Sequence, residues 1–515
     1  MSIIQTILKQ VSNNPDKPAL ILNNQLLTYQ ELALKVSSLS ASFIEKGIKQ
    51  NDHIAVLLPN SIEFAILMLV AANIGVVLVP QNMSLGHAAL SKAINASDIK
   101  HFVVWHGLVS DLKELRHSCS NSDSIWVSVG ATVDSQDTNY LNFDVLVNHA
   151  SDSYMGEHKV SPEQAFILTM TSGSTGDPKP IVLSQAVKEK RAQAAIELYG
   201  VTQRDIVLIA TPMYHSLAER LVLMPLLLGG TCVIMSGYTA KKWIDTVKEI
   251  NISFSIIVSS QLKQIMSALE LSREKLDSLR CLVSSSERLP EKVRDNFFSL
   301  FYCDFHECYG ASEIAIATNL NYQEPYVNSV GQAIKSVDIK IIDDDGQVLK
   351  VGEAGEIICK TPMLFSGYYK KPNETQASML GEYFCTGDVG KLDEKGYLSF
   401  LGRKKDIIIT GGINIYPKDI EDVISMHEHV SECAVIPIAD DFLGEQITAI
   451  IVLKPNEKLS IRELQRLCVR HLADYQQPRQ YFIDEDLPKN AMGKVMKQGL
   501  IERYQSKISD KNQHL

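Results

Sequence analysis

Hydroxyl and glycine residues crowd one segment of the chain, residues 169–180, whose sequence is TMTSGSTGDPKP. Glycines let a backbone approach a ligand closely, and hydroxyls, exposed N–H groups and an ammonium group all donate hydrogen bonds to phosphate oxygens. The segment predicts a phosphate-binding loop, and its alternative is a polar surface loop. The residues that could hold the phosphates are Thr171, Ser172, Gly173, Ser174, Thr175, Gly176 and Lys179.

The segment does not fit the Walker pattern G-x-x-x-x-G-K-[ST] of P-loop enzymes. The residue five after Gly173 is Pro178, and Lys179 is followed by Pro180. A standard P-loop is therefore excluded, and the phosphate chemistry must be of another kind.

Further motifs follow this loop in a fixed order along the chain. They are Tyr-Gly-Ala-Ser-Glu at 309–313, Thr-Gly-Asp at 386–388, Gly-Arg-Lys-Lys-Asp at 402–406, Gly-Gly-Ile-Asn-Ile-Tyr-Pro at 411–417 and Gly-Lys at 493–494. With the loop, they make the chain resemble the adenylate-forming (AMP-binding) superfamily of acyl-CoA synthetases, acyl-adenylating enzymes and beetle luciferases, and among these the 4-coumarate–CoA ligase kind. Each motif alone is weak, but their joint order and spacing are specific and cover nearly the whole chain.

The resemblance implies that ATP activates a carboxylic acid to an acyl adenylate with release of pyrophosphate. Coenzyme A then takes the acyl group as a thioester. Residues 171–179 are expected to wrap the β- and γ-phosphates. Pro180 departs from the family's glycine, and because proline fixes its own φ and restricts Lys179, we expect a stiffer loop.

The resemblance also implies roles for the residues around the nucleotide. Glu313 is expected to hold Mg²⁺, with Ser312 near the α-phosphate and with Tyr309 and Gly310 on the adenine side. Asp388 is expected to accept hydrogen bonds from the ribose, and Arg403 to reach the ribose or the phosphates. Taken alone, Glu313 could be a solvated helix-start residue, Asp388 a turn residue and Arg403 part of a solvated linker.

Lys494 matches the family's adenylation lysine, which bridges the substrate carboxylate and the α-phosphate, although a lone lysine near a C-terminus is usually a surface residue. Lys405 matches the family's hinge position. We expect a small domain to rotate about Lys405, so that Lys494 is withdrawn and the face that carries Asn414 forms the thiol channel.

His215, in the segment 211–216, matches a family histidine that lies near the acyl carboxylate, and its alternative is a core histidine. Relatives that activate amino acids usually carry Asp here, so a plain organic acid is expected. The apolar stretch 217–228 favours a fatty or aromatic acid, with Glu219 and Arg220 as its exceptions. Arg220 could bind a second carboxylate of a diacid, although pairing with Glu219 or with solvent is simpler. Three serines at 284–286 replace a glycine-rich run, which leaves the chain length of the acid open.

The elements that must position these residues alternate between helix-like stretches and short β-branched runs, which indicates an α/β architecture with mostly parallel strands. We expect a buried helix at 61–73, which is too short and too interrupted to span a membrane, and then a strand at 76–79. The predicted fold is multidomain: a large N-terminal domain, 1–402, with two tandem α/β sheets at about 1–165 and 166–336 and a small β-rich subdomain at 337–402, and a small mobile α+β domain, 403–515.

Composition excludes several classes of protein. With 50 Lys and Arg against 60 Asp and Glu, the net charge of −10 makes nucleic acid or an anionic membrane a poor partner. The nine cysteines form no C-x-x-C pair, which suits a reducing compartment better than a disulfide framework or a metal site. The first 20 residues lack the pattern of a signal peptide, so a cytoplasmic location is expected.

Several alternatives stay open at this point. The acceptor could be the pantetheine of an acyl carrier protein in place of coenzyme A. A luciferase-like oxygenase shares the same motifs, and a nucleotide-binding homologue without catalysis would also fit the departure at Pro180.

Overall fold

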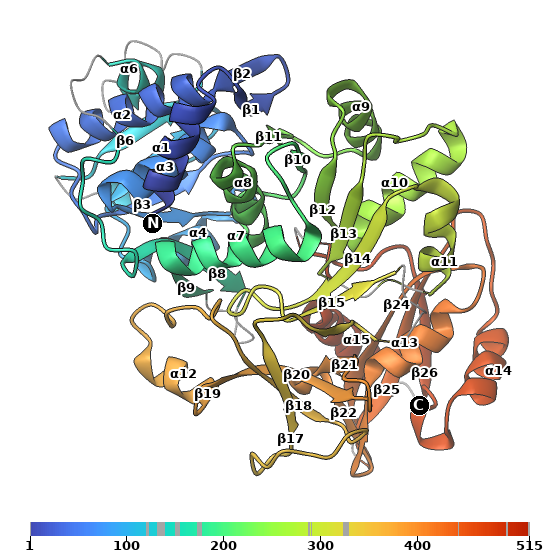
Figure 1. The fold of residues 1–515 in the computed structure, drawn as a ribbon. Helices are drawn as coiled ribbons and strands as arrows, with labels where there is room; N and C mark the ends of the chain where they lie inside the picture. The colour runs from blue at the N-terminus through green and yellow to red at the C-terminus, as the bar shows by residue number, and fades with distance from the viewer. Residues whose placement is uncertain are drawn as a thin grey trace.

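The computed structural model describes residues 2–119, 123–130, 140–149, 155–172, 178–286, 289, 291–322, 329–440, 442–490 and 493–512. Four β-sheets organise the described chain, and two large ones with their helices form most of the N-terminal part (Figure 1). Two smaller sheets follow in the last third of the sequence, coloured yellow-orange to red in the figure.

Seven strands form the first large sheet, in the order β7-β6-β5-β3-β4-β8-β9. Neighbouring strands are parallel except for the antiparallel pair β8 and β9. The expected β-branched runs are confirmed as buried strands in this sheet. Its members are β3 (His53–Leu57), β4 (Val77–Pro80), β5 (His101–Trp105), β6 (Trp126–Val129), β7 (Leu141–Asn142), β8 (Ala165–Ser172) and β9 (Pro178–Ser184).

Nine strands form the second large sheet, in the order β16-β15-β14-β13-β12-β10-β11-β1-β2. Its central strands are parallel, and antiparallel pairs close both edges. The strands are β1 (Pro18–Leu22), β2 (Gln25–Thr28), β10 (Ile206–Ile209), β11 (Thr231–Ile234), β12 (Phe254–Val258), β13 (Cys281–Ser285), β14 (Asp304–Tyr309), β15 (Thr318–Asn321) and β16 (Gln332–Ala333).

The first sheet is formed by residues 53–184 and the second by β1, β2 and the strands after residue 205, which corrects the expected division at about residue 165. The early strands β1 and β2 belong to the second sheet, where Leu20 pairs with Cys232 of β11. The later strands β8 and β9 belong to the first sheet, where Ile167 pairs with Leu78 of β4. The sequence pattern locates strands but carries no signal for their distant partners, so consecutive strands were expected to share a sheet.

Two helices, α3 (Ile62–Ile74) and α8 (Ser216–Leu228), lie in the core that the two sheets share. All but one of the 13 residues of α3 are buried, as expected for a helix that is apolar on all sides. Ser61 caps its start and Gly75, in the left-handed region, ends it. Within the described part of the chain, no helix is both long enough and apolar enough to span a bilayer.

The remaining helices of this part cover the sheets from several sides. Buried residues of α4 and α5 pack on the far face of the first sheet, and those of α9, α10 and α11 on the far face of the second. These helices are α1 (Ile3–Asn13), α2 (Tyr29–Glu45), α4 (His87–Asn95), α5 (Lys113–Cys119), α6 (Phe143–Val147), α7 (Gln185–Tyr199), α9 (Ala240–Ile250), α10 (Ser259–Ser272) and α11 (Glu291–Leu300).

A small β-rich unit follows, as expected, from residue 338 onward. Its strands are antiparallel, and the turn at 343–346 leads from β17 toward β18, whose Glu356 pairs with Ile342. Its elements are β17 (Asp338–Ile342), β18 (Gly355–Lys360), α12 (Pro372–Ala377), β19 (Met379–Leu380), β20 (Tyr383–Leu392) and β21 (Leu398–Arg403).

The terminal unit follows the short helix η2 (Lys404–Asp406). It is a five-stranded sheet, and its helices pack on the sheet in two separate hydrophobic clusters. This matches the expected α+β texture. It contains β22 (Ile408–Thr410), β23 (Ile413–Ile415), α13 (Pro417–Ser425), β24 (Val430–Asp440), β25 (Gly444–Leu453), α14 (Ile461–His471), η3 (Asp474–Gln476), β26 (Gln480–Asp484) and α15 (Lys497–Asn512).

Candidate active site

Asp388 of β20 is the buried carboxylate of the candidate site, with 2% of its surface exposed. The Tyr309 hydroxyl donates to Asp388 Oδ2 at 2.7 Å, and Arg403 Nε lies 2.8 Å from Oδ1. Burial raises the pKa of Asp388, while Arg403 and Tyr309 oppose that rise. Since Arg403 and Asp388 are opposite each other in the pairing of β20 and β21, the sheet itself brings these two predicted residues together.

The turn after β14 fits only glycine at position 310. A Cβ atom added to Gly310 would overlap the carbonyl oxygen of Ala315, so any side chain there would displace the turn. The Ala317 amide donates to the Tyr309 carbonyl at 2.8 Å and closes the same turn. The motif glycine is therefore required by close packing of the backbone.

Arg191 of α7 holds the end of this turn that carries Ser312 and Glu313. No sequence motif indicates this residue. Its guanidinium is 1% exposed and donates to the carbonyl oxygens of Ser312 at 2.9 Å, Glu313 at 2.7 Å and Met363 at 3.0 Å. Burial lowers the pKa of Arg191 to about 9. Ser312 itself is exposed, so its hydroxyl is presented on the solvent side of the turn.

Glu313 and Lys179 both lie next to the side chain of Tyr368. The Tyr368 hydroxyl donates to Glu313 Oε1 at 3.0 Å, and Lys179 Nζ lies 5.8 Å from the centre of the Tyr368 ring. Lys179 also forms an ion pair of 2.7 Å with Glu374 of α12. A half-buried carboxylate and an ammonium group thus lie around one aromatic ring, and the Glu313 oxygens are hard donors of the kind that Mg²⁺ prefers.

The predicted phosphate loop connects β8 and β9, and part of it lies outside the described residues. Gly173, Ser174, Thr175 and Gly176 lie outside the described residues, and of Thr171 and Ser172 only the backbone is described. Pro180 pairs with Met170 on β9, an edge strand, and its carbonyl accepts a hydrogen bond from the Tyr369 amide at 2.9 Å. An edge position tolerates the missing N–H of proline.

Lys494 of the terminal unit lies near enough to Asp388 and Arg403 for their charges to influence its pKa. It follows a turn in which the Asn490 side chain accepts from the Lys494 amide at 3.0 Å, and Gly493 packs against Ser260 at the start of α10. Although Lys494 keeps exposed surface, its pKa is lowered by desolvation and by Arg403, whereas Asp388 has the opposite effect. The predicted adenylation lysine and the predicted ribose carboxylate therefore act on each other electrostatically.

The joint between the two parts lies at η2. Lys404 forms ion pairs with Asp344 at 2.9 Å and Glu356 at 3.0 Å, both in the β-rich unit. Lys405, the predicted hinge, is exposed immediately after this anchor. Asn414 is exposed on β23, where it pairs with Ile409 of β22. Among the described residues, no hydrogen bond links its side chain to Asp388, Arg403 or Lys494.

His215 precedes the first turn of α8, close to the shared core. Burial lowers its pKa to about 4, so the ring is neutral near pH 7. Its Nε2 atom is buried and lacks a hydrogen-bond partner within the described chain, and the Tyr214 ring lies 4.5 Å away. His215 is therefore not a core histidine with both ring nitrogens hydrogen-bonded within the described chain. Its neutral Nε2 atom could bind a ligand.

Glu219 and Arg220 do not pair with each other. Glu219 is fully buried and forms a 2.5 Å ion pair with Lys188 of α7, while Arg220 is 6% exposed. The two simpler expectations for Arg220, a Glu219 partner or solvent, are therefore both wrong. A single sequence cannot show that a neighbouring helix supplies a lysine to Glu219.

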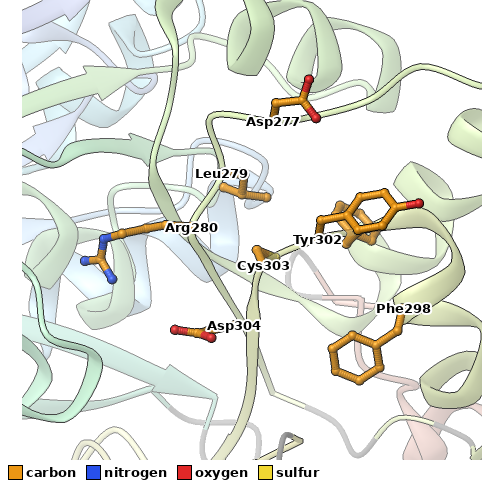
Figure 2. A pocket seen from close by; sticks show the side chains of 8 residues that line it. Asp277, Leu279, Arg280, Phe298, Tyr302, Cys303 and Asp304 are labelled. Atoms are coloured by element: carbon orange, nitrogen blue, oxygen red, sulfur yellow. The ribbon is translucent and has the colours of Figure 1, made fainter.

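A shallow hollow elsewhere on the second sheet contains none of the predicted site residues (Figure 2). It lies at the amino ends of β13 and β14, whereas ligands of open α/β sheets bind at the carboxyl ends. Burial raises the pKa of its Cys303 to about 12, and no cluster of His, Cys, Asp or Glu suited to a metal is found in the described residues. Its lining residues are Asp277, Leu279, Arg280, Phe298, Phe301, Tyr302, Cys303 and Asp304.

Comparison with protein families gives two matches. The model of AMP-binding enzymes matches residues 7–369, and that of the AMP-binding enzyme C-terminal domain matches residues 419–494. Together these matches span the large part of the chain and the terminal unit that carries Lys494.

Curated relatives match over nearly their whole length. An indoleacetate–CoA ligase of Aromatoleum aromaticum is 26% identical, with 96% of this chain and 97% of the relative covered. The long-chain-fatty-acid–CoA ligase FadD13 of Mycobacterium tuberculosis is 28% identical, with 94% of each covered. The fatty acid–[acyl-carrier-protein] ligase ScoC of Streptomyces coeruleorubidus is 25% identical, with 98% and 96% covered.

Solved structures share the whole fold. ATP-bound MatB from Rhodopseudomonas palustris matches with a TM-score of 0.88 at 25% identity, covering 98% of this chain and 99% of that chain. A fatty acyl CoA synthetase of Mycobacterium tuberculosis matches with a TM-score of 0.76 at 26% identity over the same shares. The apo form of MatB matches with a TM-score of 0.77 and shows the same fold.

Proposed function

The chain belongs to the AMP-binding enzyme family, and from that premise we propose that it activates a carboxylic acid with ATP and transfers the acyl group to coenzyme A. In the first half-reaction a carboxylate oxygen bonds to the α-phosphorus and the bond to the β-phosphate oxygen breaks, so pyrophosphate leaves. In the second, the thiol sulfur bonds to the acyl carbon, AMP leaves with the electron pair, and the thiol proton is released. The observation that supports this most directly is the buried Asp388 carboxylate held by Tyr309 at 2.7 Å and Arg403 at 2.8 Å, three motif residues brought to one place.

Two anions must meet in the first half-reaction, so the site has to neutralise charge and hold geometry. Lys494 neutralises the joined oxyanions, and Lys179 binds the departing phosphates together with residues 171–176. Asp388 accepts from the ribose hydroxyls, with Arg403 beside it. Glu313 holds the Mg²⁺ that accompanies ATP and that offsets the phosphate charge.

His215 lies next to the acid. Because its ring is neutral and its Nε2 is buried without a partner in the described chain, it donates a hydrogen bond to the carboxylate in the tautomer protonated at that nitrogen. No proton has to move during activation, which suits a group whose pKa is low. His215 thereby orients the attacking oxygen.

Domain rotation connects the two half-reactions. We propose a body of residues 1–402 and a mobile domain of residues 403–515, with Lys405 as the hinge beside the anchored Lys404. Rotation withdraws Lys494 and brings the face with Asn414 to the thiol. Asn414 is exposed here, which fits a face that acts only in the second arrangement.

The acid is an organic acid, fatty or aromatic, since the relatives above are ligases of indoleacetate and of fatty acids. The pantetheine of an acyl carrier protein is a second acceptor, because one of those relatives is an acyl-carrier-protein ligase. A cytoplasmic location is proposed as well, and the eight free cysteines among the described residues suit a reducing compartment.

The test is acid-dependent release of pyrophosphate from ATP, across fatty, aromatic and dicarboxylic acids, with and without coenzyme A. The expected result is release with some acids and formation of AMP and a thioester when coenzyme A is present. An exposed lysine of the terminal unit, changed by Lys458→Ala, is the control that should retain both. Absence of release with every acid would refute the function, and oxygen uptake or light emission would indicate the oxygenase alternative instead.

A further inference from the structure

Helices α7 and α8 bury an excess of positive charge in the core between the two sheets. The side chains of Lys188, Arg191, Glu219 and Arg220 are all at least nine-tenths buried. Three of them are cationic and one is anionic, so two positive charges remain without a carboxylate in this group. Buried charges need partners, because taking an unpaired ion out of water is expensive.

Two of the three cations have their partners within the protein. Lys188 pairs with Glu219. Arg191 donates to two carbonyl oxygens of the turn after β14, to the Met363 carbonyl and to the Ser216 hydroxyl. Those two side chains therefore have structural roles that account for their burial.

Arg220 is different. Its Nε and Nη1 atoms are buried and have no hydrogen-bond partner within the described part of the chain. The ionisable side chains that act on it most strongly are Cys308 and Tyr199, and burial raises the pKa of both, so both are neutral at pH 7. Among the described residues, the buried guanidinium group therefore has no negatively charged partner.

The position of Arg220 connects it to the acid site. It lies five residues after His215 on α8, a rise of about 7.5 Å along the helix axis. Its neighbour Cys308 directly precedes Tyr309, at the carboxyl end of β14, where the turn with Ser312 and Glu313 begins. Arg220 therefore lies close to the segment that leads into Tyr309, Ser312 and Glu313, about 1.4 helical turns after His215.

We propose that Arg220 binds a second anionic group of the substrate, so that the acid is a fatty or aromatic acid with a carboxylate at its far end. This inference rests on the proposed function, because it places the reacting carboxylate next to His215. A planar guanidinium matches a carboxylate with two parallel hydrogen bonds, and Nε with one Nη is the pair of donors for such an arrangement. The apolar residues around Arg220 make that pair strong when it forms.

The test compares acids that differ only at the far end. Octanedioate is set against octanoate and against the half-amide of octanedioate, and carboxyphenylpropanoate against phenylpropanoate, in pyrophosphate release by the full-length enzyme. The expected kcat/KM is at least about tenfold higher for each diacid than for its half-amide or monoacid, since a charged hydrogen bond is worth about a factor of ten or more. Equal or lower values for both diacids would overturn the proposal.

Variants then assign the preference to the residue. Arg220→Met is expected to abolish the diacid preference, and Arg220→Lys to retain part of it, because the ammonium keeps the charge and loses the paired donors. Lys190→Met, an exposed lysine of α7, is the matched control and should keep the preference of the natural chain. A preference that persists in folded Arg220→Met would refute the role of Arg220.

A second readout separates this inference from the proposed function. In the presence of AMP, octanedioate should raise the unfolding temperature of the natural chain more than its half-amide does. If no acid releases pyrophosphate but this difference is present, the proposed reaction fails while the Arg220 site stands. If monoacids are activated and the diacids neither stabilise nor react better, the reaction stands and the Arg220 site is wrong.

Discussion

Replacing Arg191 with lysine tests whether the Glu313 turn is held from behind by α7. The guanidinium donates to three carbonyl oxygens, of Ser312, Glu313 and Met363, from three different nitrogens. A lysine ammonium is a single point and cannot reach all three, so at least two charge-assisted hydrogen bonds are lost. At about 1.5 kcal/mol each, the loss is about 3 kcal/mol. At roughly 2 °C per kcal/mol for a large domain, the unfolding temperature should fall by about 6 °C.

The same change should alter the metal dependence of activation. When the carbonyl of Glu313 is released, its carboxylate is no longer held in one place, and loss of such supporting contacts typically weakens metal binding by about 10- to 100-fold. We therefore expect a higher Mg²⁺ concentration for half-maximal pyrophosphate release, which a loss of stability alone would not produce. Arg204→Lys, an exposed arginine before β10, is the control. An Arg191→Lys enzyme with unchanged unfolding temperature and unchanged Mg²⁺ dependence would refute this reasoning.

Three further predictions follow from the site. Lys494→Ala should lose most of the acid-dependent pyrophosphate release, by about 100-fold or more, while a fluorescent ATP analogue still binds, and unchanged release would contradict the role of the lysine. Glu374→Gln should lower the KM for ATP by a few-fold, because Lys179 is freed from its 2.7 Å ion pair, and the difference should shrink at high salt; an unchanged KM at low salt would contradict it. The pKa of His215 is lowered from 6.5 to about 4, so its contribution to stability is present above pH 6.5 and is lost, by about 3 kcal/mol, as the pH falls toward 4. The unfolding temperature of the natural chain should therefore fall more steeply between pH 7 and pH 4 than that of His215→Asn, and parallel curves would count against it.

The motifs and the type of fold were visible in the sequence because they depend on local signals. Glycine at 310 and the turn before Asp388 are set by backbone geometry within a few residues. The buried helix α3 follows from its continuous apolar run, and the short strands from their β-branched residues.

The residues that support the site could not be found in this way. Arg191 lies 121 residues from Ser312 and Tyr368 lies 55 residues from Glu313, and nothing in their own surroundings marks them. An arginine in a helix normally indicates a solvated face, so its burial appears only when the two sheets enclose α7 and α8. The expected pairing of Glu219 with Arg220 is wrong for the same reason, since the ion pair of Glu219 with Lys188 of a neighbouring helix leaves no trace in one sequence.

The second large sheet combines strands that precede and follow the first sheet along the chain, and this bears on how the chain is made. During synthesis on the ribosome, the first sheet stays incomplete until residue 184 has emerged, because β8 and β9 are its last two strands. The hairpin of β1 and β2, synthesised early, has no neighbour until β11 emerges at residue 231. The second sheet therefore cannot form until the whole first sheet has been synthesised, and a nascent chain that stalls before β11 would carry an open edge on the β1–β2 hairpin, of the kind that chaperones shield and that aggregates grow from.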